Sequence, residues 1–157
     1  GLSQNLNISR TEAREMIENY FEQYPGIKSY MDRSIELAKQ NGFVETILGR
    51  RRYLKDINSG NSVVRGHAER NAINAPIQGS AADIIKLAMI EIYNEFSSNK
   101  LQSKMLLQVH DELVFDIHHS ELDIVIPIIK TKMETAFDIS VPLEVEIGSG
   151  DNWLQAH

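Results

Sequence analysis

Apolar residues recur at helical spacing in two stretches near the amino terminus of the chain. A capping-box pair, Ser9 and Glu12, precedes the first stretch and can satisfy exposed amide groups at a helix start. In each stretch the apolar positions fall on one helical face, which is typical of an amphipathic helix packed on a core. We predict helices over residues 9–24 and 27–41, with Gly42 ending the second.

The central part of the chain changes from strand-forming residues to a long helical pattern. β-Branched residues and a turn at Gly49 predict a hairpin over residues 43–54. Residues 56–63 are rich in Asn, Ser and Gly, so we interpret them as a loop and as the boundary between two lobes. Residues 64–96 return to a helical pattern, and Pro76 within it predicts a kink or two abutting helices.

The carboxy-terminal part combines short apolar runs with one more helical segment. Two apolar runs, residues 105–109 and 113–117, flank three polar residues and predict a strand, a tight turn and a strand. Residues 120–137 are helical in pattern although Pro127 disturbs it. Residues 141–147 alternate apolar and polar residues, as a half-buried strand does. The order of elements predicts an α+β fold in which helices pack on a small antiparallel sheet.

Composition limits the classes of protein to which the chain can belong. It has 157 residues, of which 42% are hydrophobic and 24% charged, as is ordinary for a soluble globular protein. It has no cysteine, which excludes disulfides and thiolate metal sites. No apolar run reaches about 18 residues, so we predict no membrane partner. The chain does not begin with Met, and we expect it to be a piece of a longer polypeptide.

The net charge of −6 is distributed unevenly along the chain. Residues 1–65 carry 10 basic and 8 acidic residues, a balance of +2, whereas residues 66–157 carry 6 basic and 14 acidic residues, a balance of −8. The acidic half would bind a polyphosphate poorly on its own but is a reasonable place for divalent cations. We therefore expect contacts with nucleic acid to be local, assisted by cations, or shared with another part of the protein.

An acidic pair, Asp111 and Glu112, stands between the two apolar runs. Charged residues are common at hairpin turns, so a solvated turn is one interpretation. The apolar flanks Leu106–Leu107 and Leu113–Val114 predict instead a turn that is held rigidly, and His110 adds a donor for a phosphate or an oxyanion. Mg²⁺ prefers oxygen ligands and binds through one or two carboxylates plus substrate phosphates. The pair would supply half of such a site, with a second carboxylate coming from elsewhere in the fold.

Several long motifs, in order and over essentially the whole chain, resemble those of family A DNA polymerases, the bacterial DNA polymerase I type. Leu106–Val114 is similar to the palm motif of this family, and Glu69–Lys86 is similar to its long palm helix. Thr46–Tyr53 resembles its fingers hairpin. Two further segments resemble the carboxy-terminal end of the family, Val141–Val145 and Asp151–Trp153.

The resemblance implies an enzyme that transfers nucleotides to a primer 3′-hydroxyl, copying a template by a two-metal mechanism in DNA replication and repair. Asp111 would be a catalytic metal ligand, Glu112 would lie close to the metals, and His110 would contact the primer-terminal backbone. The implied cofactor is Mg²⁺, held only partly by this chain. The implied partners are primer–template DNA and deoxynucleoside triphosphates, and the implied location is the bacterial cytoplasm, with the nucleoid.

The resemblance also assigns DNA contacts on the minor-groove side to Arg70, Asn74 and Gln78. Their spacing of four residues places them on one helical face. Minor-groove acceptors occur in every base pair, so such donors can check pair geometry without reading sequence. A solvated helical stripe is the alternative, and Pro76 could turn Gln78 off the face.

Basic residues are densest in the predicted hairpin. Arg50 and Arg51 are followed by Arg52 and Lys55. A solvated hairpin tip and a contact with the DNA backbone both explain such a cluster, and the sequence does not choose between them.

The resemblance makes residues 1–62 part of the fingers subdomain and residues 63–157 the carboxy-terminal part of the palm. The family also uses a second aspartate, in an Asp-Tyr-Ser type segment, and a fingers helix with Lys and Tyr, and this sequence has neither. We therefore expect this chain to be inactive alone and to need the missing upstream part of the polymerase. A non-catalytic DNA-binding fragment is the alternative, and a metal-dependent nuclease that uses His110, Asp111 and Glu112 is a third interpretation.

Overall fold

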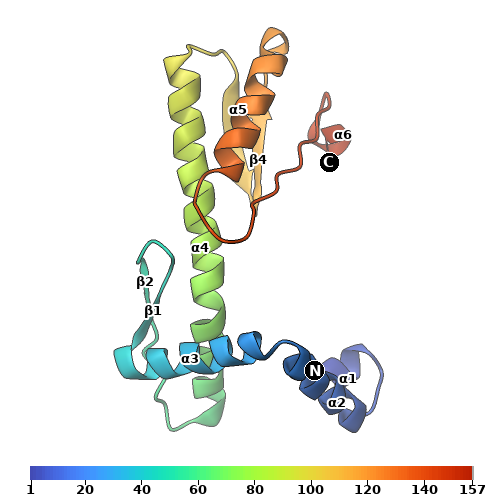
Figure 1. The fold of residues 1–157 in the computed structure, drawn as a ribbon, viewed down its shortest axis with the longest axis vertical. Helices are drawn as coiled ribbons and strands as arrows, with labels where there is room; N and C mark the ends of the chain where they lie inside the picture. Colours follow the sequence, from blue (N-terminus) through green and yellow to red (C-terminus); the bar gives the residue numbers. More distant parts are fainter. Residues whose placement is uncertain (157) are drawn as a thin grey trace. The chain divides into compact units, whose positions relative to one another are not determined.

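The chain forms two compact units, Gly1–Ile77 and Gln78–His157, with the boundary inside one long helix (Figure 1). A computed structural model describes residues 1–156. Each unit combines helices with a two-stranded antiparallel sheet, so the predicted α+β class is confirmed. None of the helices in this described range is long and apolar enough to cross a membrane.

The first unit begins with three helices. A short helix α1 (Leu2–Asn5), which the sequence pattern does not predict, precedes α2 (Arg10–Gln23) and α3 (Pro25–Asn41). Pro25 occupies the first position of α3, where its missing N–H costs no helical hydrogen bond. Gly42 ends α3 with a φ of 78°, a left-handed conformation that glycine adopts without steric cost. Both predicted helices are therefore confirmed.

The predicted hairpin is also present in the first unit. Strands β1 (Phe43–Glu45) and β2 (Arg51–Tyr53) pair antiparallel, with Gly49 in the turn at a φ of 76°. The hairpin packs with α3 and with the first half of α4 (Ser62–Ser98) around one apolar cluster. Small residues supply the contacts on α4, which lets the backbones approach closely. The cluster contains Ala38, Val44, Leu54, Ile57, Ala68, Ala72 and Ala75, with Ile35 packed against it.

The predicted capping box is formed at the start of α2. The Ser9 hydroxyl accepts the Glu12 N–H at 3.1 Å, and the Glu12 carboxylate accepts the Ser9 N–H at 2.8 Å. Replacing Ser9 by Ala removes the first bond, and we expect the free energy of unfolding to fall by about 1 kcal/mol. Thermal unfolding followed by circular dichroism measures the loss. Ser29→Ala, at an exposed position inside α3, is the control, and an equal midpoint for both variants would argue against the cap.

Helix α4 runs through Pro76 as a single helix of 37 residues, so the alternative of two abutting helices is wrong. A proline inside a helix cannot donate to the carbonyl four residues earlier, which costs about 3 kcal/mol or more. The helix continues because each half is held by its own apolar cluster. Ala72 and Ala75 lie in the cluster of the first unit, and Ile92 and Phe96 lie in that of the second.

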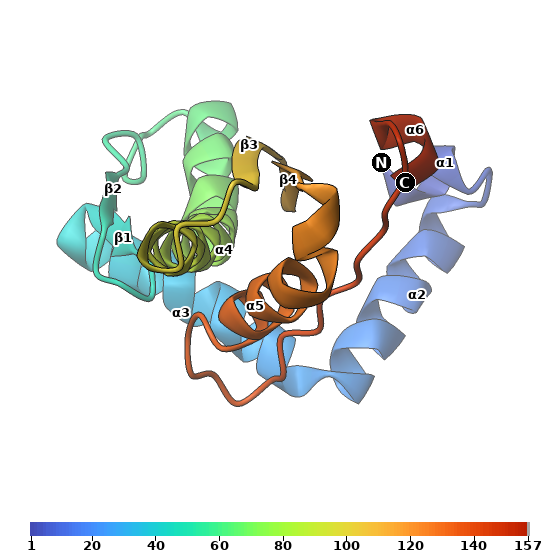
Figure 2. The ribbon, with the colours of Figure 1, turned by 90° about the horizontal axis from the view of Figure 1, so that it is seen from above.

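The second unit contains the predicted strand, tight turn and strand, followed by a helix. The helix α5 is shorter than the predicted range 120–137 and begins after one turn of 3-10 helix, η1. Figures 1 and 2 both show α5 beside the second half of α4. The elements are β3 (Lys104–Val109), β4 (Glu112–Asp116), η1 (His119–Glu121), α5 (Leu122–Glu134) and α6 (Trp153–Ala156).

A second apolar cluster joins α4, α5 and one face of the β3–β4 hairpin. Its fully buried side chains come from the two helices, and the strands contribute half-buried residues that cover it. This cluster fixes the hairpin on the helices and therefore fixes the turn at its tip. The buried members are Ile92, Phe96, Val125 and Ile129, against which Met105, Leu113, Phe115 and Ile117 pack.

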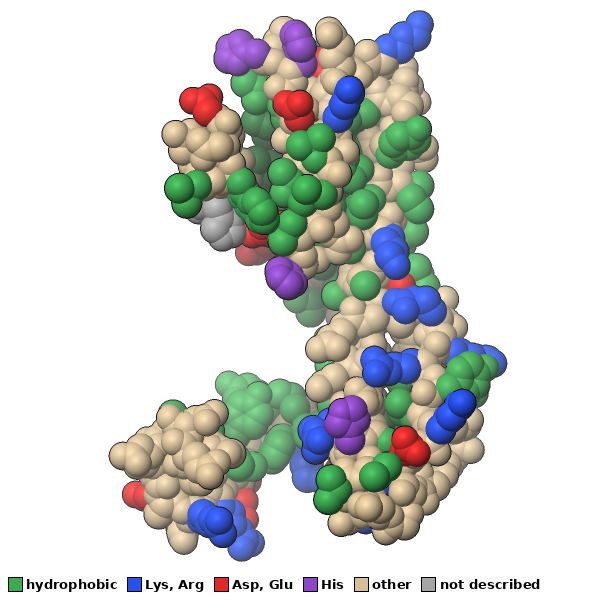
Figure 3. All heavy atoms as spheres, turned by 180° about the vertical axis from the view of Figure 1, so that it is seen from behind, with side chains coloured by type: hydrophobic (Ala, Val, Ile, Leu, Met, Phe, Trp, Pro, Cys, Tyr) green, Lys and Arg blue, Asp and Glu red, His purple; other side chains and the backbone are tan. Residues whose placement is uncertain are grey.

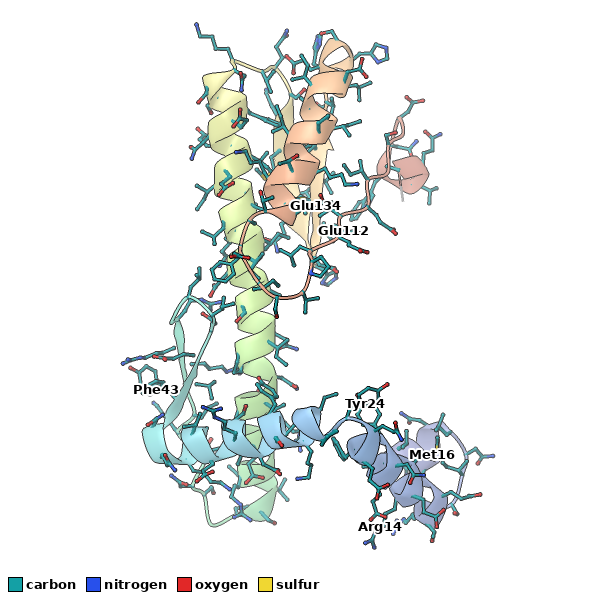
Figure 4. All side chains as sticks on the ribbon, in the orientation of Figure 1. Arg14, Met16, Tyr24, Phe43, Glu112 and Glu134 are labelled. Atoms are coloured by element: carbon teal, nitrogen blue, oxygen red, sulfur yellow. The ribbon has the colours of Figure 1, made fainter. Side chains whose placement is uncertain are left out.

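The strand predicted over residues 141–147 is not formed, and this segment is irregular. Each sheet of the described range has two strands, and neither pairs with it. Pro142 carries no N–H for a ladder, and the Val145 N–H donates to the Glu134 carboxylate at 3.4 Å, near the end of α5 (Figure 4). Leu143 and Val145 are half-buried and Glu144 is exposed, so the alternation correctly predicts which side chains are covered. It does not show whether a partner strand is present.

Candidate metal-binding turn and nucleic-acid interface

A two-residue turn joins β3 to β4 and carries the acidic pair. Val109 pairs with Glu112, so His110 and Asp111 form the loop (Figure 4 labels Glu112). His110 has a φ of 54°, a left-handed conformation that costs a non-glycine residue about 1–3 kcal/mol. Positive φ suits a two-residue hairpin because it follows the twist of the strands. Gln108 Nε2 donates to the His110 carbonyl at 2.8 Å and holds this strained residue beside the carboxylate.

The two strands contribute unequally to holding this turn. Phe115 on β4 and Met105 on β3 pack against the second apolar cluster. Leu106 and Leu107 are 57% and 47% exposed, so of the four apolar flanks Leu113 packs on the cluster and these two do not. A bulge explains the difference. Met105 pairs with Phe115 and Leu107 with Val114, so Leu106 is an extra residue that breaks the alternation of the strand. That the flanks hold the turn rigidly stays a prediction.

A buried carboxylate fastens the other end of the hairpin. Glu121 accepts hydrogen bonds from the Ser103 hydroxyl at 2.6 Å and from the Ser103 N–H at 2.9 Å. Its two oxygens also accept the Gln102 N–H, at 2.9 Å and 3.1 Å. The Ser103 hydroxyl oxygen in turn accepts the His118 N–H at 3.0 Å. The residues before β3 and after β4 are thereby tied together.

These hydrogen bonds also set the ionisation of Glu121. The Gln102 N–H, and after it the Ser103 hydroxyl, hold the pKa of the Glu121 carboxyl below its ordinary value. Sequence reasoning misses this group because its partners lie 18 and 19 residues earlier, and no local spacing connects them. An acidic residue directly before a helix is the single local signal, and it is also common in solvated turns.

The acidic pair offers hard oxygen ligands of the kind that Mg²⁺ prefers. Asp111 is exposed in the turn, and Glu112 is half-buried at the first position of β4. Within residues 1–156, no group of three or more His, Asp and Glu side chains is placed to hold a metal ion. The chemistry of the pair therefore fits part of a divalent-cation site.

The three residues assigned to the minor groove are all exposed on α4. Arg70 and Asn74 lie one turn apart in the first unit, on a helix that turns Ala72 into the core. Gln78 begins the second unit, which also contains the acidic turn at Asp111. The predicted exposure therefore holds for each residue, and the contact with DNA remains a prediction.

Arg51 of the basic hairpin contacts two other residues of the same hairpin. Arg51 Nε donates to the Glu45 carboxylate at 2.8 Å, and the guanidinium lies 4.4 Å from the centre of the Phe43 ring, labelled in Figure 4. The bond to Glu45 raises the pKa of Arg51. Arg50 is exposed directly before β2. Figure 3 shows Lys and Arg side chains gathered over the hairpin and the first half of α4.

Comparisons with known proteins agree with these features. Residues 1–155 match the family described as DNA polymerase family A. The chain is 52% identical over 155 residues to DNA polymerase I of Caldicellulosiruptor bescii. It is 47% identical over 156 residues to DNA polymerase I of Bacillus subtilis. Both alignments cover 99% of this chain and 18% of the relative, so the chain spans less than a fifth of their length.

A solved structure gives the same result for the fold. The chain matches the POL domain of Pol1 from M. smegmatis, solved in complex with DNA primer-template and dNTP, with a TM-score of 0.97 and 45% identity. The match covers 99% of this chain and 28% of that chain. Fold and sequence agree over nearly every residue, and the chain therefore belongs to family A of the DNA polymerases.

Proposed function

We propose that this chain is part of a DNA-directed DNA polymerase, which adds deoxynucleotides to a primer 3′-hydroxyl as a template directs. The acidic turn carries the proposal, because it stands on a braced hairpin in a chain that matches the polymerase domain of a primer-template complex. The DNA polymerase I relatives support a role in bacterial DNA replication and repair. Such a protein would act in the cytoplasm, with the nucleoid.

Three neighbouring residues would serve the reaction. Asp111 would hold a divalent cation, Mg²⁺ by the chemistry of its oxygen ligands, and Glu112 would lie close by. Bound divalent ions stabilise the negative charge that develops on the attacking and leaving oxygens. His110 would donate a hydrogen bond to a backbone phosphate at the primer end. The two-residue loop keeps these groups together because it leaves them little freedom to separate.

The proposed contacts with primer–template DNA come from exposed donors. Arg70, Asn74 and Gln78 would face minor-groove acceptors, which every base pair provides. Arg50 and Arg51 would contact the phosphate backbone from the β1–β2 hairpin. We assign residues 1–62 to the fingers subdomain and residues 63–157 to the palm.

The chain alone is expected to incorporate no nucleotide. Asp111 and Glu112 supply only part of a divalent-cation site within the described range, so the charge of the transition state is not held. The test is extension of a radiolabelled primer on a template with Mg²⁺ and all four deoxynucleoside triphosphates. The same preparation carrying Asp111→Ala sets the background. Extension above that background would contradict the prediction, and extension by a longer polypeptide that contains the upstream region would support the proposed function.

A non-catalytic DNA-binding module is the second candidate for the chain by itself. The incomplete set of metal ligands and the exposed basic side chains favour it. Fluorescence anisotropy with a labelled duplex would detect weak binding that falls as salt rises. The same duplex incubated with Mg²⁺ or Mn²⁺ tests the nuclease interpretation, for which we expect no cleavage.

A further inference from the structure

A tyrosine of α3 reaches across to the backbone of α4 within the first unit. The Tyr30 hydroxyl donates to the carbonyl oxygen of Ile73 at 3.0 Å, over a separation of 43 residues along the chain. Tyr30 is 37% exposed, so the residue is partly covered where its hydroxyl makes this contact. Such a contact is unusual, because a carbonyl inside a helix normally accepts the N–H of a residue four positions later in the same helix.

The reason lies three residues further along α4. Pro76 has no N–H to donate to the Ala72 carbonyl, so the turn of α4 that contains Ile73 lacks one of its backbone hydrogen bonds. A carbonyl oxygen has two lone pairs, so the Ile73 carbonyl can accept a donor from outside the helix as well as an N–H of its own helix. Ile73 lies on this turn, and the Tyr30 hydroxyl supplies a donor there.

The same turn carries a proposed DNA contact. Ile73 directly precedes Asn74, so a bond to its carbonyl restrains the peptide from which the Asn74 side chain projects. A helix advances by about 100° per residue, so a small rotation of this turn would change where Asn74 points. A fixed direction matters for an amide that must meet acceptors in a groove.

A second contact from α3 lies next to Arg70, the other residue of the first unit that is proposed to contact DNA. Lys39 Nζ lies 2.8 Å from the Glu69 carboxylate, and Glu69 directly precedes Arg70. This ion pair is partly exposed and contributes little energy on its own. The two contacts from α3 nevertheless touch α4 immediately before Arg70 and immediately before Asn74.

We propose that Tyr30 is a positioning residue for the DNA-facing side of α4, acting through the backbone at Ile73 to fix the direction of Asn74. This inference rests on the proposed function, since it concerns the same nucleic-acid interface. It adds a residue that touches no DNA itself. Its effect is on affinity for primer–template, and chemistry at the acidic turn is untouched.

The test is a double-mutant cycle in the polymerase polypeptide that contains this chain together with its upstream region. Tyr30→Phe removes only the hydroxyl and is expected to raise the Kd for primer–template about 3- to 10-fold, the range of one lost hydrogen bond. The kcat at saturating DNA should stay unchanged, and the midpoint of thermal unfolding should fall by a few degrees at most, as the loss of one hydrogen bond allows. In an Asn74→Ala background, Tyr30→Phe should have no further effect on the Kd.

Tyr93→Phe is the matched control, because Tyr93 is a 67% exposed tyrosine in the second half of α4. A full effect of Tyr30→Phe in the Asn74→Ala background, or an unchanged Kd, would overturn the positioning role. A thermal midpoint lowered by much more than the loss of one hydrogen bond explains would make Tyr30 a structural residue and would also overturn the positioning role. A separate result would contradict the proposed interface itself: an Asn74→Ala variant whose Kd for primer–template equals that of the unmodified protein.

Discussion

Replacing Asp111 by Ala in the polymerase polypeptide that carries this chain is expected to lower nucleotide incorporation by about 10³-fold or more. A single group that stabilises transition-state charge contributes about 10²–10³-fold in other enzymes, and a metal ligand affects both reacting oxygens. The Kd for primer–template should change by less than about twofold, because Asp111 is an exposed acidic residue and a carboxylate does not attract phosphate. Single-turnover primer extension measures the first quantity and anisotropy the second.

Asp116→Ala is the matched control for this experiment. Asp116 is also an exposed aspartate, at the far end of β4, and its loss removes the same charge from the same hairpin. We expect its incorporation rate to stay within about twofold of the unmodified enzyme. Near-normal turnover by Asp111→Ala would refute the metal-ligand role. Equal losses in both variants would show that the charge of the hairpin matters and the position of Asp111 does not.

Elements with local signals could be predicted from the sequence. The capping pair at Ser9 and Glu12 marks the start of α2 because its hydrogen bonds join residues three apart. The acidic turn is equally local, since two apolar runs of strand length leave room for little more than His110 and Asp111 between them. The sequence therefore predicts that the candidate site is a turn, but it does not predict the positive φ of His110.

Features that depend on distant partners could not be predicted. The strand expected over residues 141–147 has the correct alternation but no partner strand within the described range. Pro76 has the local signature of a helix break, and packing on each side of it keeps α4 continuous. The bulge at Leu106 depends on its pairing with β4, so the exposure of Leu106 and Leu107 is invisible in a list of apolar residues.

Glu121→Gln is expected to lower the midpoint of thermal unfolding of this chain by several degrees at pH 7, more than Ser9→Ala does. The carboxylate of Glu121 accepts from three donors, the Gln102 N–H, the Ser103 N–H and the Ser103 hydroxyl. An amide offers one acceptor oxygen and turns an NH₂ group toward the remaining donors, which leaves buried polar groups without partners. The loss loosens the base of the hairpin whose tip carries Asp111.

The same substitution should change how stability depends on pH. Because the pKa of Glu121 is lower in the folded chain than in the unfolded chain, ionised Glu121 stabilises the fold above the unfolded pKa of about 4.3. This contribution is lost as the pH falls through the folded pKa. The difference in unfolding midpoint between the unmodified chain and Glu121→Gln should therefore be full at pH 7 and narrow progressively below about pH 5.

Glu146→Gln, at an exposed position, is the control for removing one acidic charge. A difference that stays constant from pH 7 to pH 4 would show that shape at residue 121 stabilises the hairpin and the carboxylate charge does not.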